Sequence, residues 1–225
     1  MWQATRTKNG WSEPRPASFN SVDNDFDPSF SADGTTLYFF SNRPGGFGGD
    51  DLYSVHYDST TATFGMPVNM GSQFNTASDE WGPTESVDGK KFLFCTDGMK
   101  GKGNHDIFVC DRTATGWSQP KNIEAINSPE DDFDPVFLHD CSTIVFTRKK
   151  SDDEAFLYVS FLQKDGYSIP QKLDSTINIS GTWNFGSSID PTDSSHLYYS
   201  THNPSNTQGR MDIYRIKYII TGSRK

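Results

Sequence analysis

Short apolar runs, at most four or five residues long and separated by polar and glycine-containing segments, dominate the chain. Three of these runs, Leu37–Phe40, Phe92–Cys95 and Ile144–Phe146, are apolar without alternation. A strand whose two faces are both covered produces this pattern. No stretch repeats apolar residues at a helical spacing between capping residues, so we expect very little helix. The pattern predicts an all-β protein made of short, buried strands.

Turn signals separate these strands. Asp33-Gly34 and Asp88-Gly89 lie between apolar runs and predict tight hairpins, because both residue types tolerate a positive φ. The glycine-rich segments 45–49 and 98–103 predict looser turns that lead into the next strand.

A first landmark, an aromatic residue followed three positions later by proline, recurs four times. The pairs are Trp11 and Pro14, Phe64 and Pro67, Trp117 and Pro120, and Tyr167 and Pro170. The prolines are 53, 53 and 50 residues apart. Each is followed by an apolar residue and asparagine: Phe19-Asn20, Phe74-Asn75, Ile126-Asn127 and Ile177-Asn178.

A second group of landmarks follows in each copy. An acidic-aromatic step opens it: Asp25-Phe26, Glu80-Trp81, Asp132-Phe133 and the divergent Asn184-Phe185. The Asp-Gly turn of the first two copies is replaced in the others by Asp140-Cys141 and Asp193-Ser194. A later strand begins at Asp51-Leu52-Tyr53, Asp106-Ile107-Phe108, Phe156-Leu157-Tyr158 and Asp212-Ile213-Tyr214. This repetition is the strongest signal in the sequence.

Each unit of about fifty residues is interpreted as four short antiparallel strands. Such sheets, apolar on both faces, are what a β-propeller requires, since each blade packs between two others. We expect one propeller domain over residues 1–225, with units at about 11–60, 64–113, 117–163 and 167–218.

Residues 1–10 predict part of a preceding blade, because Trp2–Arg6 align with Phe108–Arg112. One interpretation is a five-bladed parent whose first blade is incomplete here. The other is a four-bladed ring that closes by lending the Trp11–Pro14 strand to the last blade. The otherwise redundant Trp2–Arg6 strand favours the five-bladed parent, and both interpretations place the N-terminal strand near the C-terminal blade.

These landmarks resemble the WD40-like β-propeller repeat of the TolB propeller domain and of many exported bacterial proteins. The best match is Asp25 to Gly34, followed by Leu37-Tyr38-Phe39, Ser41-Asn42-Arg43, Gly45-Gly46 and Asp51-Leu52-Tyr53. The third copy lacks the Asp-Gly turn and the glycine loop, and the fourth lacks the proline of the opening strand. The resemblance covers roughly residues 2 to 218 and implies a periplasmic, cell-surface or secreted protein-binding propeller. It is not specific for any activity.

Charge and composition narrow the partners. Twenty Lys and Arg against 29 Asp and Glu give a formal charge of −9, which disfavours nucleic acid and anionic membranes. No apolar run is long enough to span a bilayer, and the N-terminal residues contain no signal peptide. Cys95, Cys110 and Cys141 lack metal-like spacing and are interpreted as buried thiols, although a disulfide between Cys95 and Cys110 is conceivable.

The acidic positions of the innermost strands converge on the mouth of the propeller channel. They are Asp25, Asp27, Glu80, Asp132 and Asp134, with Asn184 in the last copy. Converging carboxylates suit Ca²⁺, here at Asp25, Glu80 and Asp132, or general acid and base roles in glycoside hydrolysis. Because they follow the repeat, the favoured interpretation is that each caps a turn or bonds a neighbouring blade.

Residues that break the repeat are better functional clues. The positions after the second strand hold Asn42, Asp97, Lys149 and His202. Asn42, Asp97 and His202 join the candidate ligand-binding residues. The other histidines fall at different repeat positions, so no metal-binding spacing emerges.

We therefore expect a non-catalytic binding or scaffolding propeller of a bacterial envelope, which recognises a protein or a glycan and needs no cofactor, unless it binds Ca²⁺. The alternative is a glycan hydrolase or lyase that uses the channel acids. Such an enzyme needs two carboxyl groups about 5–10 Å apart, whereas a scaffold needs the same acids bonded to backbone in every blade.

Overall fold

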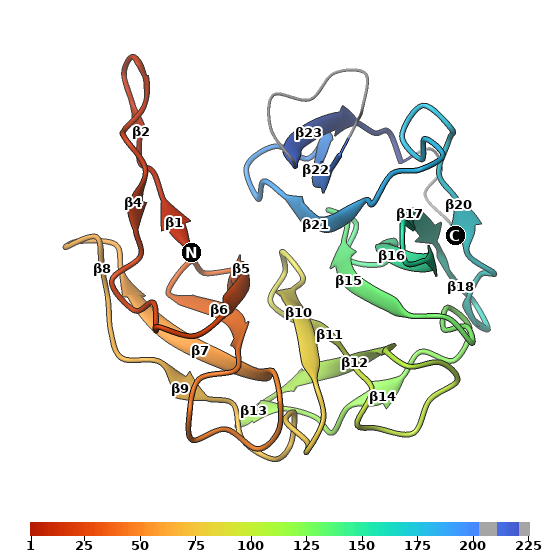
Figure 1. Cartoon of the computed structure of the whole chain (residues 1–225), viewed down its shortest axis with the longest axis horizontal. Coiled ribbons are helices and arrows are strands. Elements are labelled where there is room, and N and C mark those ends of the chain that lie inside the picture. The colour runs from red at the N-terminus through yellow and green to blue at the C-terminus, as the bar shows by residue number, and fades with distance from the viewer. Residues whose placement is uncertain (203–210, 221–225) are drawn as a thin grey trace.

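The computed structural model describes residues 1–202 and 211–220 and confirms the β-propeller (Figure 1). Four blades of antiparallel strands surround a central axis. The described residues form no helix, so none is long and apolar enough to cross a membrane. The low helix content expected from the apolar pattern is therefore confirmed.

The first two blades share one plan, with three long strands and an outermost strand split into two short pieces. The first blade comprises β5 (Asp25–Phe30), β6 (Thr36–Ser41), β7 (Asp51–Asp58), β8 (Thr63–Phe64) and β9 (Val68–Asn69). The second comprises β10 (Glu80–Glu85), β11 (Lys91–Thr96), β12 (Asp106–Thr113), β13 (Gly116–Trp117) and β14 (Lys121–Asn122). Both outer pieces pair with the third strand, β7 or β12.

The third and fourth blades repeat this plan with changes. The third comprises β15 (Asp132–Phe137), β16 (Ile144–Ser151), β17 (Glu154–Ser160) and β20 (Gln171–Lys172), with a hairpin of β18 (Leu162–Gln163) and β19 (Gly166–Tyr167). The fourth comprises β21 (Phe185–Ile189), β22 (His196–Thr201) and β23 (Asp212–Lys217). Among the described residues, β23 pairs with β22 alone.

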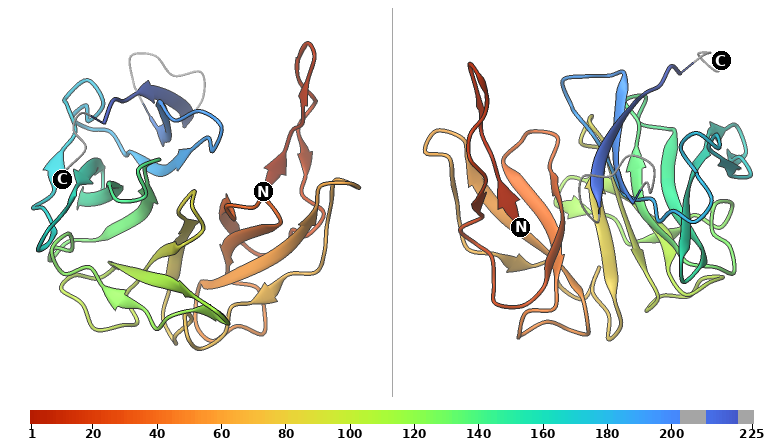
Figure 2. Two further views of the ribbon diagram at one scale, coloured as in Figure 1. Left: turned by 180° about the vertical axis from the view of Figure 1, so that it is seen from behind. Right: turned by 45° about the horizontal axis from the view of Figure 1, so that its top comes forward.

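The N-terminal residues form a long hairpin of their own. Its strands are β1 (Trp2–Gln3), β2 (Arg6–Thr7), β3 (Gly10–Trp11) and β4 (Arg15–Pro16), with β1 pairing β4 and β2 pairing β3. The Trp11–Pro14 segment is thus not lent to the last blade, as the four-bladed closure would require. The hairpin stands apart from β23 in both views of Figure 2.

The Asp-Gly turns form as predicted, and the divergent third copy keeps their geometry. Gly34 and Gly89 both have φ of +70°, and Cys141 has φ of +53° at the equivalent position. The Asp33 carboxylate accepts a hydrogen bond from the backbone of Thr35, and Asp140 accepts one from Thr143. The aspartate therefore holds the turn even where glycine is missing.

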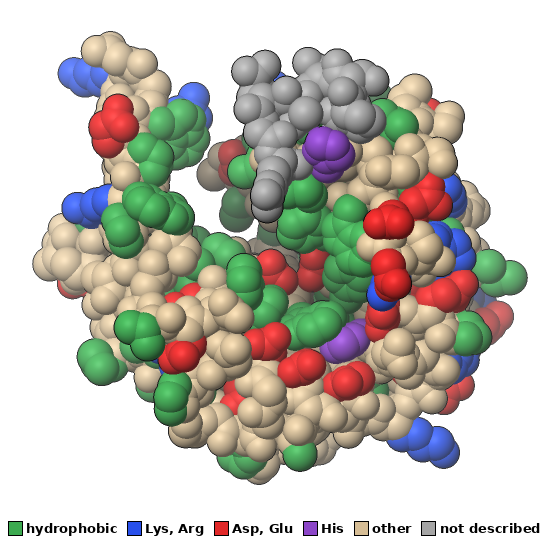
Figure 3. Space-filling model, in the orientation of Figure 1, with side chains coloured by type: hydrophobic (Ala, Val, Ile, Leu, Met, Phe, Trp, Pro, Cys, Tyr) green, Lys and Arg blue, Asp and Glu red, His purple; other side chains and the backbone are tan. Residues whose placement is uncertain are grey.

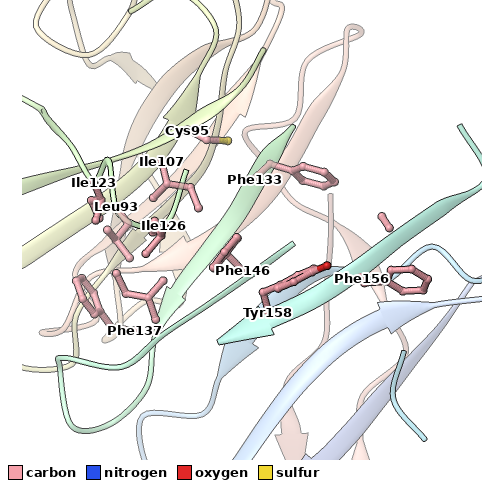
Figure 4. Packing of buried hydrophobic residues seen from close by; sticks show 12 residues of the cluster. Leu93, Cys95, Ile107, Ile123, Ile126, Phe133, Phe137, Phe146, Phe156 and Tyr158 are labelled. Atoms are coloured by element: carbon pink, nitrogen blue, oxygen red, sulfur yellow. The ribbon is translucent and has the colours of Figure 1, made fainter. Parts of the chain in front are cut away.

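The core lies between blades. A cluster between the second and third blades includes Leu93, Ile107, Ile126 and Phe146, which are fully buried (Figure 4). Continuous apolar runs are explained by this arrangement, because both faces of β11 and β16 meet a neighbouring blade. The three cysteines are free thiols, two of them buried.

Candidate functional site

Each innermost strand contains an irregularity at the same repeat position, midway along the channel. The register shifts after the second residue of β5, β10 and β15 and after the first residue of β21, which are equivalent positions in the repeat. The residues there all have positive φ: Asp27 (+50°), Gly82 (+59°), Asp134 (+49°) and Gly186 (+63°). Such bulges re-aim side chains and are found next to functional sites. Two of the four positions hold an aspartate in a backbone conformation that favours glycine.

Asp27 and Asp134 face each other at this level, although they belong to the first and third blades. The two carboxyl groups lie near enough for each to perturb the pKa of the other. Asp134 Oδ2 accepts a hydrogen bond of 2.7 Å from the backbone of Gly186. Burial raises the pKa of both carboxyls, and the charge of Asp134 raises the pKa of Asp27 further. Asp27 therefore has the more strongly raised pKa of the two.

A cavity of about 510 Å³ adjoins this pair. It is lined by all four innermost strands, including Ser29, Thr84, Val136 and Ser188. Perturbed carboxyl groups that line a cavity are candidate ligand-binding or acid-base groups.

Replacing Asp27 with asparagine is expected to stabilise the protein at pH 8 by about 1–2 kcal/mol and to change little at pH 4. Because the folded-state pKa of Asp27 is raised, the stability due to its proton is complete below the ordinary aspartate pKa of about 3.9. That stability is lost as the pH rises through the raised value. Asparagine keeps a hydrogen-bond donor at every pH. Urea unfolding at pH 4, 6 and 8 measures the effect.

The exposed Asp23→Asn variant is the control for that experiment, because it removes one carboxylate from a site without burial. An equal pH response of the two variants would contradict a raised pKa for Asp27.

The acids at the starts of the innermost strands are engaged within their own blades. Each accepts a backbone hydrogen bond from the loop four residues earlier, as three pairs show: Ser21 to Asp25 (2.7 Å), Thr76 to Glu80 (2.9 Å) and Ser128 to Asp132 (2.7 Å). Asn184 instead donates to Ile177 and Asn178. The structure therefore gives all four predicted candidates a hydrogen-bonding role inside the fold.

The second partner of each acid sets its pKa. Burial raises the pKa of Asp25, but hydrogen bonds from Arg43 (2.6 Å) and Ser21 outweigh it and leave the pKa lowered. At Asp132 burial outweighs the Arg148 guanidinium, so its pKa is raised. Glu80 has Thr96 in place of an arginine, and burial raises its pKa.

Asn42 and Asp97 occupy equivalent positions on the face where the innermost strands begin. Asn42 Oδ1 accepts a 2.9 Å hydrogen bond from the backbone of Asn24, and Asp97 Oδ1 accepts one of 3.0 Å from that of Asp79. His202 is half-buried at the end of β22. Acidic side chains border the central hollow in the view of Figure 3, and most visible Lys and Arg side chains lie toward the outer edge.

A group that sequence reasoning did not assemble lies on the second blade beside Asp97. One carboxylate oxygen each from Asp79 and Asp97 and one imidazole nitrogen of His105 lie within 4.8 Å of one another. These residue types are metal ligands. His105 Nδ1 lies 3.2 Å from Asp131 Oδ1. The Trp81 ring stacks on the imidazole with centroids 3.7 Å apart.

A signal for this group was present in the sequence. His105 immediately precedes the third strand of its blade, where the other copies have Asp50, Ala155 and Met211. A search for a common spacing among all histidines does not single out His105. A comparison with the equivalent residues of the other copies does, because the other copies have no histidine at this position.

Comparisons with known proteins support the fold and leave the activity open. No protein-family model matches the sequence, the WD40-like repeat family included, and no curated protein matches it. Among solved structures, the putative TolB from Agrobacterium tumefaciens is similar, with 16% identity and a TM-score of 0.56. The match covers 91% of this chain and 65% of that chain, so the chain spans just under two thirds of that protein's length.

Two glycan-related structures are similar to the same degree. The endo-arabinase from Bacteroides thetaiotaomicron VPI-5482 has 13% identity and a TM-score of 0.54, over 96% of this chain and 83% of that chain. The α-L-arabinofuranosidase from Lactobacillus brevis has 14% identity and a TM-score of 0.52, over 86% and 67%. At these identities the likeness shows the β-propeller fold alone.

Proposed function

We propose that this chain is a non-catalytic binding propeller of a bacterial cell envelope, and that its ligand is a protein with basic residues. The ligand docks on the face where the innermost strands begin, which we call the entry face. A TolB-like fold is compatible with this role.

The observation that carries the proposal is that hydrogen bonds within the fold already occupy the acids that recur at the start of the innermost strands. Asp25, Glu80 and Asp132 each accept hydrogen bonds from backbone amides of their own blade. This arrangement was the one expected of a scaffold. The acids left to interact with a ligand are those that vary between blades, such as the exposed Asp23 and Asp97.

Charge complementarity selects the kind of partner. A net charge of −9 and an acidic border around the hollow favour a basic segment and disfavour anionic ligands (Figure 3). Electrostatic attraction of this kind weakens as salt is added.

A glycan hydrolase is the second candidate, and the Asp27–Asp134 pair is the observation in its favour. The pair lines a cavity and has raised pKa values. However, paired-carboxylate hydrolysis needs about 5 Å or more between the two groups, to leave room for the sugar or a water molecule. The mutual perturbation of Asp27 and Asp134 is typical of a closer pair of carboxyls than this reaction uses, so the binding role is preferred.

The test is capture of envelope proteins and glycans by the immobilised full chain, in EDTA, at low and at 0.5 M salt (about a 4 Å screening length). The face variant is Asp23→Asn with Asp97→Asn. The matched control is Glu13→Gln with Asp165→Asn, which removes the same charge from exposed positions on outer hairpins. We expect the face variant to lose at least tenfold in capture and the control variant to capture as the unmodified chain does.

Equal capture by both variants would overturn the docking face. Release of reducing ends from a glycan panel, with loss of that activity in Asp27→Asn, would instead establish the hydrolase.

A further inference from the structure

We propose that Asp79, Asp97 and His105 bind a divalent first-row transition metal ion at the entry face of the second blade. The three donor atoms lie within 4.8 Å of one another. Bonds of 2.0–2.2 Å to a single ion place ligand atoms about 3–4.4 Å apart. A small movement closes the difference, and Asp97 is exposed and therefore able to make it.

The environment of His105 points to a ligand independently of the acidic cluster. The residue is only 7% exposed, and its Nε2 atom is buried with no hydrogen-bond partner among the described residues. The other ring nitrogen, Nδ1, faces Asp131 Oδ1 at 3.2 Å. A proton on Nδ1, donated to Asp131, leaves Nε2 with an unshared electron pair. A buried acceptor without a donor is costly, and a bound cation would satisfy it.

The surrounding residues hold the imidazole as metal-site partners usually do. A carboxylate behind the histidine, here Asp131, fixes the tautomer and the orientation of the ring. Trp81 stacks on the imidazole at 16° and donates a 2.9 Å hydrogen bond to Asp50. The ring is therefore fixed from one edge and one face before any ion arrives.

The two aspartates each keep one oxygen for a ligand. Asp79 Oδ1 accepts a 2.8 Å hydrogen bond from the backbone of Asp50, and Asp97 Oδ1 accepts one of 3.0 Å from the backbone of Asp79. Their Oδ2 atoms accept no hydrogen bond from the residues that the structure describes. The backbone contacts orient the carboxylates and leave these oxygens available.

The donor set selects the class of ion. One imidazole nitrogen and two carboxylate oxygens suit Zn²⁺ or Mn²⁺, whereas Ca²⁺ is bound through oxygen alone. Three protein ligands leave further positions for water.

The site belongs to one blade and is not a by-product of the repeat. The equivalent residues are Asn24, Asn42 and Asp50 in the first blade and Asp131, Lys149 and Ala155 in the third. Of these three blades, the second alone has a carboxylate or an imidazole at all three positions.

The experiment is titration calorimetry of the chelator-treated full chain with ZnCl₂, MnCl₂ and CaCl₂. We expect one Zn²⁺ or Mn²⁺ ion per chain with a Kd in the micromolar range or tighter. The Asp97→Asn variant should bind at least tenfold more weakly, because it loses an anionic ligand from an exposed position. Asp23→Asn, which removes an exposed carboxylate from another blade of the same face, should bind as the unmodified chain does.

Co²⁺ provides a direct readout of the donor set. Its visible absorption should appear on addition to the unmodified chain and be lost in His105→Gln, whose folding is checked by circular dichroism. Absence of stoichiometric binding, equal affinity in Asp97→Asn, or binding of Ca²⁺ alone would each overturn the proposal. The capture experiment above is run in EDTA, so the two proposals fail separately.

Discussion

Replacing Arg148 with alanine is expected to lower the free energy of unfolding by about 3–5 kcal/mol. Arg148 Nε lies 2.6 Å from Asp132 Oδ1, and its Nη2 donates a 2.7 Å hydrogen bond to the carbonyl of Ile126. The Asp132 side chain is fully buried. Removing the guanidinium leaves a buried carboxylate without its counter-charge, and this costs far more than the pair itself contributes.

The pH dependence of this variant has a definite sign. Burial raises the pKa of Asp132 even with Arg148 present. Loss of the arginine removes an interaction that lowers this pKa, so the variant should be least stable above neutral pH and recover partly in acid. Urea unfolding at pH 4 and 8 measures both effects.

Lys150→Ala is the matched control. Its ion pair with Glu130 is also short, at 2.8 Å, but both side chains are more than a third exposed, at 35% and 41%. A surface pair of this kind contributes about 0–1 kcal/mol. If Arg148→Ala cost no more than Lys150→Ala, the account of Asp132 as a buried, compensated charge would be wrong.

Replacing Asn127 with alanine is expected to cost about 2–4 kcal/mol, the second largest effect. Asn127 Oδ1 accepts a 2.9 Å hydrogen bond from the backbone of Ile107, and its Nδ2 donates one of 3.0 Å to the carbonyl of Ile107. Ile107 is fully buried, so alanine would leave its amide N–H unsatisfied, while its carbonyl would keep the 3.1 Å hydrogen bond from the backbone of Ile123. Thermal and urea unfolding provide the measurement.

The exposed Asn24→Ala variant controls for the loss of an amide, and we expect it to change stability by less than about 0.5 kcal/mol. Asn75 and Asn178 make the same pair of bonds to Leu52 and Leu157, so their alanine variants should resemble Asn127→Ala. A cost near zero at all three would show that these side-chain hydrogen bonds between the loop and the third strand do not stabilise the fold.

The apolar-asparagine step illustrates what repetition alone can predict. It recurs at Asn75, Asn127 and Asn178 as a landmark of the repeat. The structure explains the recurrence, because each asparagine side chain bonds both backbone groups of one residue in the third strand. The same reasoning predicted the turns, because Asp33 and Asp140 act on amides two or three residues away. Such interactions are local in the chain and therefore visible in its pattern.

The candidate sites were less visible. Asp25, Glu80 and Asp132 were identified as channel acids, but their hydrogen bonds to backbone required the loops to be placed. His105 was not among the candidates, because the histidines share no metal-binding spacing along the chain. Its partners come from different loops, and only their arrangement in space makes a site.

By itself, the sequence determined the strands, the tight turns, the fifty-residue unit and hence the propeller, since each follows from short-range periodicity and residue preference. Only the tertiary structure decided that Asp27 meets Asp134 across the channel and that Asp131 lies behind His105. Those contacts join different blades. They depend on how the blades are arranged around the common axis. Packing between neighbouring sheets sets this arrangement, and the local sequence pattern within a single blade does not.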